Sequence, residues 1–293
     1  MRIIDVDSHY FEPPDWLAQV DPRLAAEIPA ADPIEGVARF VVGDLLDEVP
    51  REQLPADLLD LLAPAGHRAF ESSARRVEEE AAEARPAPMS YDAEARLAFN
   101  DALGIDVQFL NPTSGAQPFG AAMRAGRPDL ARRALAAYNT WSAQTLAGHT
   151  DRLIPTTMID ASDVGWAVNE LTRMRAAGSR AFQIRAEPVD GRKSLAHPDL
   201  DPLWAAAADL GMAAVFHIGG ARLDVDKGWY FNGGPPSNFA LLHLVAGSMV
   251  PQIALAALLI EGVFERHPGL VLIVEELGIT WLPHFLTTID SIT

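Results

Sequence analysis

The chain contains no cysteine among its 293 residues. Disulfide bonds, zinc–thiolate sites and thiol nucleophiles are therefore excluded, and a metal ion would have to be held by His, Asp and Glu side chains. Basic residues are also few, because 23 Lys and Arg stand against 40 Asp and Glu, which gives a formal net charge of −17. Such a surface repels phosphate backbones, so we expect no nucleic-acid partner.

Long apolar runs are missing as well. No stretch reaches the roughly 18 to 20 continuous apolar residues of a membrane span, and the longest candidate, around 253–260, fits a buried helix. At the N-terminus, Asp5 and Asp7 appear before any apolar run long enough for a signal peptide. We therefore expect a cytoplasmic protein with no membrane partner.

Short apolar runs alternate with helical patterns along most of the chain. Several helical patterns end at a glycine that is followed by an apolar run, which is the helix-to-strand junction of a parallel sheet. The expected helices are 93–103, 130–146, 164–177, 203–210 and 251–266. The expected strands are 3–6, 105–110, 153–158, 181–184, 213–216 and 270–274. Six such units predict an α/β fold, either a (β/α) barrel or a doubly wound sheet.

Residues 12–92 depart from this alternation. They contain Pro-rich turns, an apolar run at 38–42 and a segment of mixed charge at 74–80. The stretch is too long for a loop between a strand and a helix. We expect an insertion after the first strand, over the C-terminal mouth of the sheet, within a single domain covering residues 1–293. Within it, 76–83 is expected to be a solvated helix face or a mobile loop.

The first candidate site follows the first apolar run, at Asp7-Ser8-His9. Residues i and i+2 of a strand point to the same side, so Asp7 and His9 are directed together past the end of the strand. A carboxylate oxygen and an imidazole nitrogen that converge in this way suit a divalent metal ion. The alternative is an exposed turn with a chance histidine.

His217 ends the fifth apolar run and is followed by Gly219 and Gly220, which allow the backbone to turn close to a ligand. Functional groups of parallel α/β folds gather at the carboxyl ends of the strands. His217 is therefore expected to lie near Asp7 and His9 as a further metal ligand. The alternative is a core histidine satisfied by a hydrogen bond.

Two acids, Glu275 and Glu276, end the sixth run. Alternation predicts that one faces the barrel axis and the other faces outward. An inward carboxylate beside a metal can be a general base, a substrate anchor or a further ligand. The alternative is that one of them caps a helix starting near Ile279.

Arg185 ends the fourth run, where its guanidinium can clamp a substrate carboxylate. The alternative is a salt bridge to Glu187 or to the acidic insertion. Among the other histidines, His197 is expected to be a loop residue, and His243 either reaches the mouth of the sheet or packs within the fold.

Three aromatic residues lie in the glycine-rich segment 219–236 after the fifth run. They are Trp229, Tyr230 and Phe231. This loop either forms the wall of an aromatic pocket or lies mobile on the surface.

With these residues in place, the chain resembles the amidohydrolase-2 group of the metal-dependent amidohydrolase superfamily, which includes aminocarboxymuconate-semialdehyde decarboxylase and the resorcylate-type decarboxylases. The resemblance runs from Met1 to about Asp290 and is strongest in 5–15, 91–112, 197–219 and 262–290. It implies a distorted TIM barrel, a metal-ligand pair at Asp7 and His9, and a further ligand at His217. Relatives of the decarboxylase type have a catalytic histidine after the sixth strand, where this chain has Glu276, as the Glu-x-Gly branch of the family does.

One family feature is missing from the sequence. The family's last strand supplies an Asp, usually within a Gly-Ser-Asp-Tyr-Pro-His-like run, and no such run occurs here. We therefore expect a barrel lacking its last strands, either because the sequence is a truncated product or because a second polypeptide or subunit completes it.

These observations lead to one expected function and two alternatives. Asp7, His9 and His217 would hold one divalent ion, Zn²⁺ or Mn²⁺, while Glu276 moves a proton and Arg185 anchors negative charge. The expected activity is metal-dependent hydrolysis of a small, carboxylated or aromatic compound, because a carboxylate at 276 cannot take the cationic role of a histidine in decarboxylation. The alternatives are a non-oxidative metal-dependent decarboxylase and a non-catalytic barrel subunit that needs a partner. Apart from the substrate, the expected partner is a second copy of the chain or a polypeptide that completes the barrel.

Overall fold

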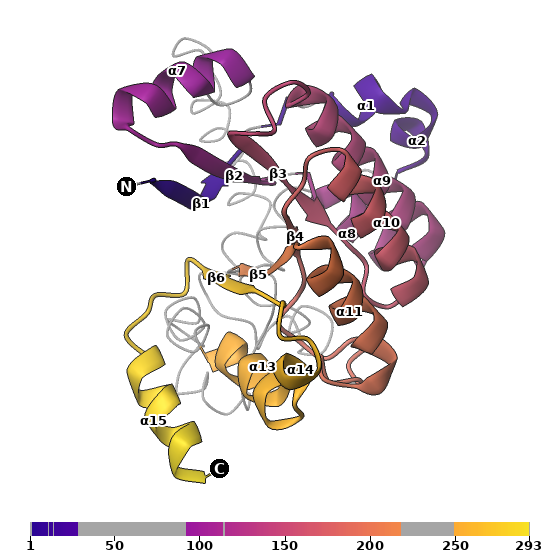
Figure 1. Cartoon of the computed structure of the whole chain (residues 1–293). Coiled ribbons are helices and arrows are strands. Elements are labelled where there is room, and N and C mark those ends of the chain that lie inside the picture. Colours follow the sequence, from indigo (N-terminus) through magenta and orange to yellow (C-terminus); the bar gives the residue numbers. More distant parts are fainter. Residues whose placement is uncertain are drawn as a thin grey trace, which may run out of the picture. The chain divides into compact units, whose positions relative to one another are not determined.

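Six parallel strands form one continuous sheet in the order of the sequence (Figure 1). The computed structural model describes residues 2–10, 12–13, 15–28, 92–113, 115–217 and 249–292. The strands are β1 (Ile4–His9), β2 (Val107–Asn111), β3 (Leu153–Met158), β4 (Ala181–Gln183), β5 (Ala213–His217) and β6 (Leu272–Glu275). Every neighbouring pair is parallel, and β1 and β6 are the two edges of the sheet.

The sheet curves into a nearly closed barrel. Side chains of β1 and β5 touch although three strands separate them, because His9 Nε2 lies 3.1 Å from His217 Nε2. Asn111 at the end of β2 likewise donates a hydrogen bond of 2.8 Å to Glu275 at the end of β6. The α/β barrel prediction is thus confirmed, with six strands in the described part of the chain.

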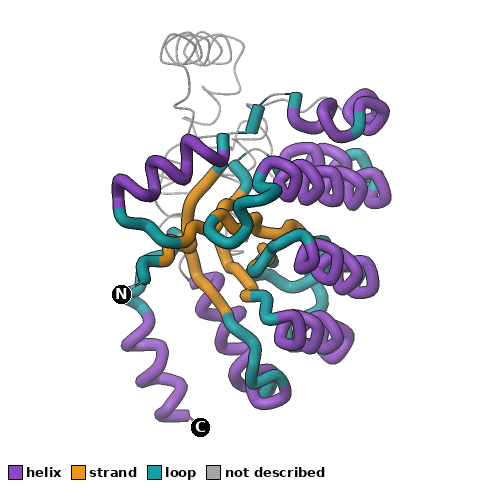
Figure 2. Tube along the Cα trace, turned by 45° about the horizontal axis from the view of Figure 1, so that its top comes forward, coloured by secondary structure: helices purple, strands orange, loops and turns teal. Residues whose placement is uncertain are grey.

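Helices follow the strands and lie on the outside of the sheet, as Figure 2 shows. Those after β1 and β2 are α1 (Trp16–Val20), α2 (Pro22–Glu27), α7 (Ala93–Leu103), α8 (Gln117–Arg124) and α9 (Pro128–Thr145). The later ones are α10 (Val164–Ala176), the short 3₁₀ helix η3 (Pro198–Leu200), α11 (Asp201–Leu210), α13 (Met249–Ile260), α14 (Val263–Arg266) and α15 (Leu282–Ile292). In the described part of the chain, none of these helices is both long enough and apolar enough to cross a membrane.

Capping residues explain why the helices begin and end where they do. The Asp92 carboxylate accepts a hydrogen bond from the Ala95 amide at the start of α7, and Asp163 does the same for Trp166 at the start of α10. Gly104 ends α7 with a φ of 73°, a left-handed conformation that favours glycine. The chain then enters β2 at Val107, two residues later than the start at 105 that the sequence predicted.

Some boundaries differ from the prediction. The helix expected at 251–266 is divided into α13 and α14, because Gly262 adopts a φ of 68° between them. The helix α8 was not expected, and neither were α1 and α2, which lie at the start of the stretch interpreted as an insertion. Most of that stretch, the aromatic segment 219–236 and His243 lie outside the described residues.

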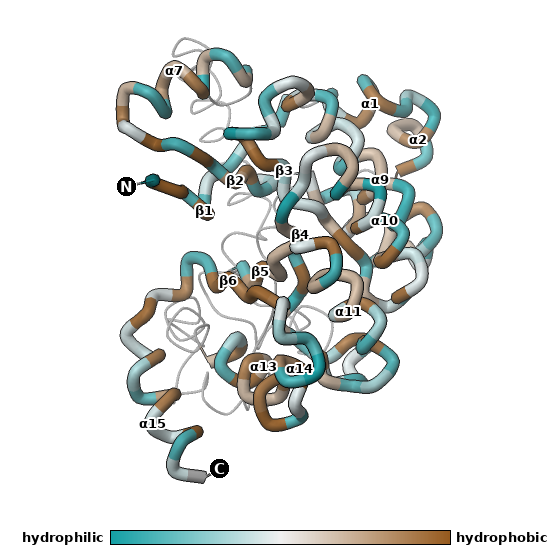
Figure 3. Tube along the Cα trace, in the orientation of Figure 1, coloured by the Kyte–Doolittle hydropathy of each residue, from teal (hydrophilic) through white to brown (hydrophobic). Residues whose placement is uncertain are grey.

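The core lies between the sheet and the helices. Leu110, Leu153, Phe182 and Phe216 are buried on four different strands, and hydrophobic stretches on the strands and along α13 are visible in Figure 3. Trp16 of α1 packs edge-on against Tyr138 of α9, with ring centroids 5.5 Å apart. Residues just after β1 therefore join, through α1, a hydrophobic cluster that includes Leu110 of β2 and Leu153 of β3.

Candidate metal centre

Asp7 and His9 lie in the second half of β1, where the pairing with β2 is irregular. Asp5 pairs with Gln108 and Ser8 with Leu110, so three steps along β1 match two steps along β2. One extra residue in a strand is a β-bulge, a feature that often redirects side chains near functional sites. Asp7 Oδ1 lies 3.7 Å from His9 Nε2, so the two side chains converge as the sequence predicted.

Two more strand ends complete the cluster. His217 is the last residue of β5, and its Nε2 lies 3.1 Å from His9 Nε2 and 3.7 Å from Asp7 Oδ1. Glu276 follows the last residue of β6, and its carboxylate oxygens lie 3.9 Å from each histidine Nε2. One potential ligand atom from each of these four residues lies within 4.8 Å of all the others.

The orientation of the His9 ring is set by the backbone. His9 Nδ1 lies 3.0 Å from the carbonyl oxygen of Pro112. A carbonyl can only accept, so Nδ1 carries the hydrogen and donates it. The lone pair of the neutral ring is therefore on Nε2, which faces His217 and Asp7, the arrangement usual for a metal-binding histidine.

Asp7 provides a test of whether a cation fits this cluster. Its Oδ1 is buried and accepts no hydrogen bond from any of the described residues. A buried carboxylate oxygen without a donor is costly, and a cation beside it would remove that cost. Two imidazole nitrogens and two carboxylates form a ligand set that suits Zn²⁺ or Mn²⁺, so the residues present fit a divalent ion.

The two acids at the end of β6 have different surroundings. Glu275 is 3% exposed and accepts the hydrogen bond from Asn111. Burial, reinforced by the negative charge of Asp7, raises the pKa of Glu275 to about 8. Glu276 is 45% exposed and adopts a φ of 57°, which is strained for a residue other than glycine.

This left-handed residue modifies the alternation that the sequence predicted. The side chain of Glu275 points across the barrel to β2, and the turn at Glu276 also brings its carboxylate to the histidines rather than to the outside. Neither acid caps a helix near Ile279, because α15 begins at Leu282.

Asn111 and Pro112 are parts of the site that the sequence interpretation missed. Asn111 is fully buried at the end of β2, and Pro112 fixes the His9 ring through its carbonyl. The signal was available for Asn111, because it is a polar residue directly after an apolar run, like His217. The role of Pro112 depends on its backbone oxygen, which every residue type has, so the sequence could not indicate it.

Arg185 is not part of this cluster. It lies two residues beyond β4, its side chain is 55% exposed, and it forms a close ion pair with Glu187. The ion pair is the alternative weighed for this residue, and its role in substrate binding stays a prediction. His197 accepts a hydrogen bond from the Asp199 amide at the start of η3.

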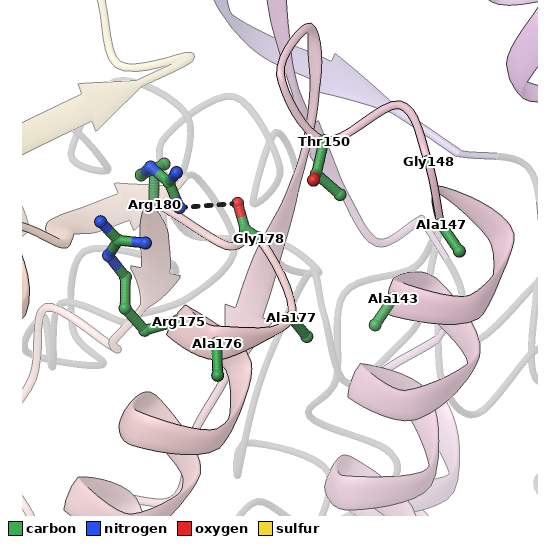
Figure 4. A pocket seen from close by; sticks show the side chains of 9 residues that line it. All are labelled: Ala143, Ala147, Gly148, Thr150, Arg175, Ala176, Ala177, Gly178 and Arg180. Carbon is green, nitrogen blue, oxygen red and sulfur yellow. Dashed lines mark hydrogen bonds between the residues drawn. The ribbon is translucent and has the colours of Figure 1, made fainter.

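A pocket of about 500 Å³ lies between the carboxyl ends of α9 and α10 (Figure 4). It borders residues that precede β4, whereas the metal-binding candidates lie at the other ends of their strands. Its two arginines donate hydrogen bonds to backbone carbonyl oxygens, Arg175 to that of Leu210 and Arg180 to that of Gly178. With neither histidine nor carboxylate in its lining, this pocket is not a second metal centre.

The fold and the cluster define an α/β barrel protein with a candidate metal centre at the carboxyl ends of its strands. The chain belongs to the Amidohydro_2 family of amidohydrolases, whose profile matches residues 4–291. This confirms the resemblance noted in the sequence. No curated protein matches the chain.

Solved structures share the fold. An amidohydrolase from Mycobacterium avium subsp. paratuberculosis K-10 is 21% identical, with a TM-score of 0.63 over 99% of this chain and 76% of that chain. The 5-carboxyvanillate decarboxylase from Novosphingobium aromaticivorans DSM 12444, complexed with manganese and 4-hydroxy-3-methoxy-5-nitrobenzoic acid, is 20% identical, with a TM-score of 0.55 over 99% and 69%. The 5-carboxyvanillate decarboxylase from Sphingomonas paucimobilis is 19% identical, with a TM-score of 0.53 over 99% and 72%.

Proposed function

We propose that this protein is a metal-dependent enzyme that removes carbon dioxide from a small aromatic acid without oxidation. The observation that carries the proposal is the cluster of Asp7, His9, His217 and Glu276, whose ligand atoms lie within 4.8 Å of one another in an Amidohydro_2 chain. Two proteins of similar fold are decarboxylases of an aromatic acid, which supports decarboxylation over the hydrolysis expected from the sequence.

In this proposal Asp7, His9 and His217 hold one divalent ion. Either Zn²⁺ or Mn²⁺ suits the ligands, and the manganese in the decarboxylase from N. aromaticivorans favours Mn²⁺. The bound ion supplies Lewis-acid polarisation of a substrate oxygen. His9 is oriented to bind the ion by its hydrogen bond to the Pro112 carbonyl, because the ring needs no reorientation to present Nε2.

Glu276 is the proposed proton donor. When the bond between the ring and the carboxylate breaks, carbon dioxide leaves and the electron pair remains on the ring carbon, which must take up a proton. The Glu276 carboxyl group can deliver that proton, because it lies beside both histidines at the mouth of the site. Since 45% of its side chain is exposed, it can be reprotonated from water.

Hydrolysis is the second candidate, and Glu276 is the observation that favours it. A carboxylate next to a metal ion can take a proton from water, which makes the water a nucleophile. The same four residues would then act on an amide, an ester or a lactone. Under either reaction Arg185 is the proposed anchor for a negatively charged group of the substrate.

The experiment that decides between these activities uses the purified chain loaded with Mn²⁺. It is incubated separately with 5-carboxyvanillate, with simpler hydroxybenzoates, and with small aromatic amides, esters and lactones. We expect carbon dioxide release from at least one aromatic acid, abolished in the His217→Ala variant. Cleavage of the amides, esters or lactones alone would contradict decarboxylation, and inactivity of a chain that also binds no metal would favour the non-catalytic subunit.

A further inference from the structure

Arg96 is a buried arginine behind the segment that carries Asp7 and His9. It lies on α7, and only 8% of it is exposed. Its two terminal nitrogens bind the last two residues of β1. Nη1 donates a hydrogen bond of 3.0 Å to the Ser8 hydroxyl, and Nη2 donates one of 2.7 Å to the backbone oxygen of His9.

The same guanidinium is also connected to the backbone of Asp7, through the side chains of Gln108 and Asp5. Nη1 donates a hydrogen bond of 3.0 Å to the amide oxygen of Gln108, and Gln108 Nε2 donates one of 2.8 Å to the Asp5 carboxylate. The other carboxylate oxygen of Asp5 accepts a hydrogen bond of 3.1 Å from the backbone amide of Asp7. The backbone on each side of Asp7 is therefore tied to α7 and β2, across the β-bulge.

A buried arginine that forms no close ion pair lowers the stability of the fold, so its presence here suggests another role. Burying a cation is unfavourable unless its donors are satisfied, and Arg96 makes no ion pair within 4.0 Å to a carboxylate among the described residues. Its donors go to neutral oxygens of Ser8, His9 and Gln108. Hydrophobic residues would join α7 to the sheet at lower cost, but they would not fix the polar groups at the end of β1.

We infer that Arg96 is a positioning residue that sets the geometry of Asp7 and His9 as metal ligands. The inference rests on the proposed metal centre and adds a residue that does not itself touch the ion. The planar guanidinium can reach the Ser8 hydroxyl and the His9 carbonyl at once with a fixed angle between its donors, whereas a lysine ammonium cannot reproduce this fork. Partners that orient metal ligands in this way typically change metal affinity about 10- to 100-fold when they are mutated.

Arg152 offers a matched control for this test. It also donates to backbone oxygens, those of Ile105 and Asp106, but at the opposite end of β2 from the cluster. The variants Arg96→Lys and Arg152→Lys therefore each lose guanidinium hydrogen bonds to backbone oxygens, although Arg152 also forms an ion pair with Asp101. Only the first should alter the ligands, while both should lower thermal stability.

The measurement is the affinity of the folded full chain for Mn²⁺, by calorimetric titration, for the wild type and both variants. We expect Arg96→Lys to bind Mn²⁺ about 10- to 100-fold more weakly and Arg152→Lys to bind as the wild type does. A second readout needs no metal: histidine nitrogen chemical shifts should show that His9 loses its uniform Nδ1–H form in Arg96→Lys and keeps it in Arg152→Lys.

The outcomes separate the inference from the proposed function. If the wild type binds no Mn²⁺ or Zn²⁺, the proposed function fails, and the His9 spectrum alone decides whether Arg96 positions the ring. If Arg96→Lys does not fold, Ser8→Ala takes its place, since it removes one acceptor of Arg96, and a smaller loss in the same direction is expected. A folded variant with the affinity and the His9 spectrum of the wild type overturns the inference.

Discussion

His9 and His217 are 208 residues apart in sequence, yet their Nε2 atoms lie 3.1 Å apart. The hydrogen of His9 is on Nδ1, so its Nε2 lone pair is directed at the second ring. Two nitrogens bound to one ion at about 2.0–2.1 Å, with angles of roughly 90–109°, are about 2.8–3.4 Å apart. The observed separation lies within the range that suits two ligands of a shared ion, and it is also the length of a hydrogen bond between the two rings.

Removing either histidine should remove the ion. We expect one tightly held divalent ion per wild-type chain, and close to none in His9→Ala or His217→Ala, because each substitution deletes one of two nitrogen ligands. Elemental analysis of the dialysed proteins measures the stoichiometry. His149→Ala is the control, since His149 pairs with Glu94 at 3.4 Å and belongs to no group of potential metal ligands found among the described residues; equal metal loss in this variant would contradict the assignment.

Metal binding should stabilise the fold, because the ligands come from β1 and β5 and from the residue after β6. At free Mn²⁺ about 100 times its Kd, the gain is about 2.7 kcal/mol, which corresponds to a rise in Tm of roughly 4–5 °C for a chain of 293 residues. Calorimetry with Mn²⁺ and with a chelator measures it. The rise should vanish in His217→Ala, and a rise of equal size there would place the ion elsewhere.

Glu276→Gln should separate proton transfer from metal binding. The amide keeps the shape of the side chain and still offers an oxygen, but it cannot donate the required proton. We expect turnover to fall by about 10²- to 10⁴-fold, with Mn²⁺ affinity changed far less than in His217→Ala. The comparison needs kcat and calorimetric Kd for the same preparations. A variant that loses metal and activity together would make Glu276 a ligand instead.

Much of the fold was predictable because strands and helices have different hydrophobic periods. The segments at 93–103 and 153–158 match α7 and β3, and the glycine at 104 marks the junction that follows. The helices α1 and α2 were missed because each is short and lies among prolines. Their stability comes from packing, such as that of Trp16 on Tyr138, which no local pattern reveals.

The candidate site was partly predictable for a topological reason. Carboxyl ends of parallel strands meet at one edge, so Asp7, His9 and His217 could be grouped from sequence alone. The position of the Glu276 carboxylate depends on a left-handed backbone conformation. The alternation of side chains along a strand cannot predict such a conformation. The contribution of Arg96 depends on how α7 packs behind β1, which is a property of the folded chain.

Arg185→Met tests whether this arginine anchors the substrate. If it binds a substrate carboxylate, KM should rise by about tenfold or more while kcat changes less, since one charge-assisted hydrogen bond contributes about 1.5–3 kcal/mol. Steady-state kinetics on the aromatic acid that proves active measures this. An unchanged KM would mean that the ion pair with Glu187 is the whole role of Arg185.

Leu110→Ala tests the barrel core independently of the chemistry. Leu110 on β2 has 0% of its surface exposed, so the truncation should lower the free energy of unfolding by about 2–5 kcal/mol. Leu103→Ala, on the adjoining α7 and 57% exposed, should change it by less than about 0.5 kcal/mol. Urea unfolding of both variants measures the difference, and similar losses would contradict the burial of β2.

The most direct test of the metal centre is anomalous X-ray scattering at the manganese edge, from crystals of this chain grown with Mn²⁺. We expect one strong peak at about 2.0–2.2 Å from Nε2 of His9, Nε2 of His217 and a carboxylate oxygen of Asp7. No peak among these three residues, or manganese bound only by carboxylates elsewhere on the surface, would contradict the central claim.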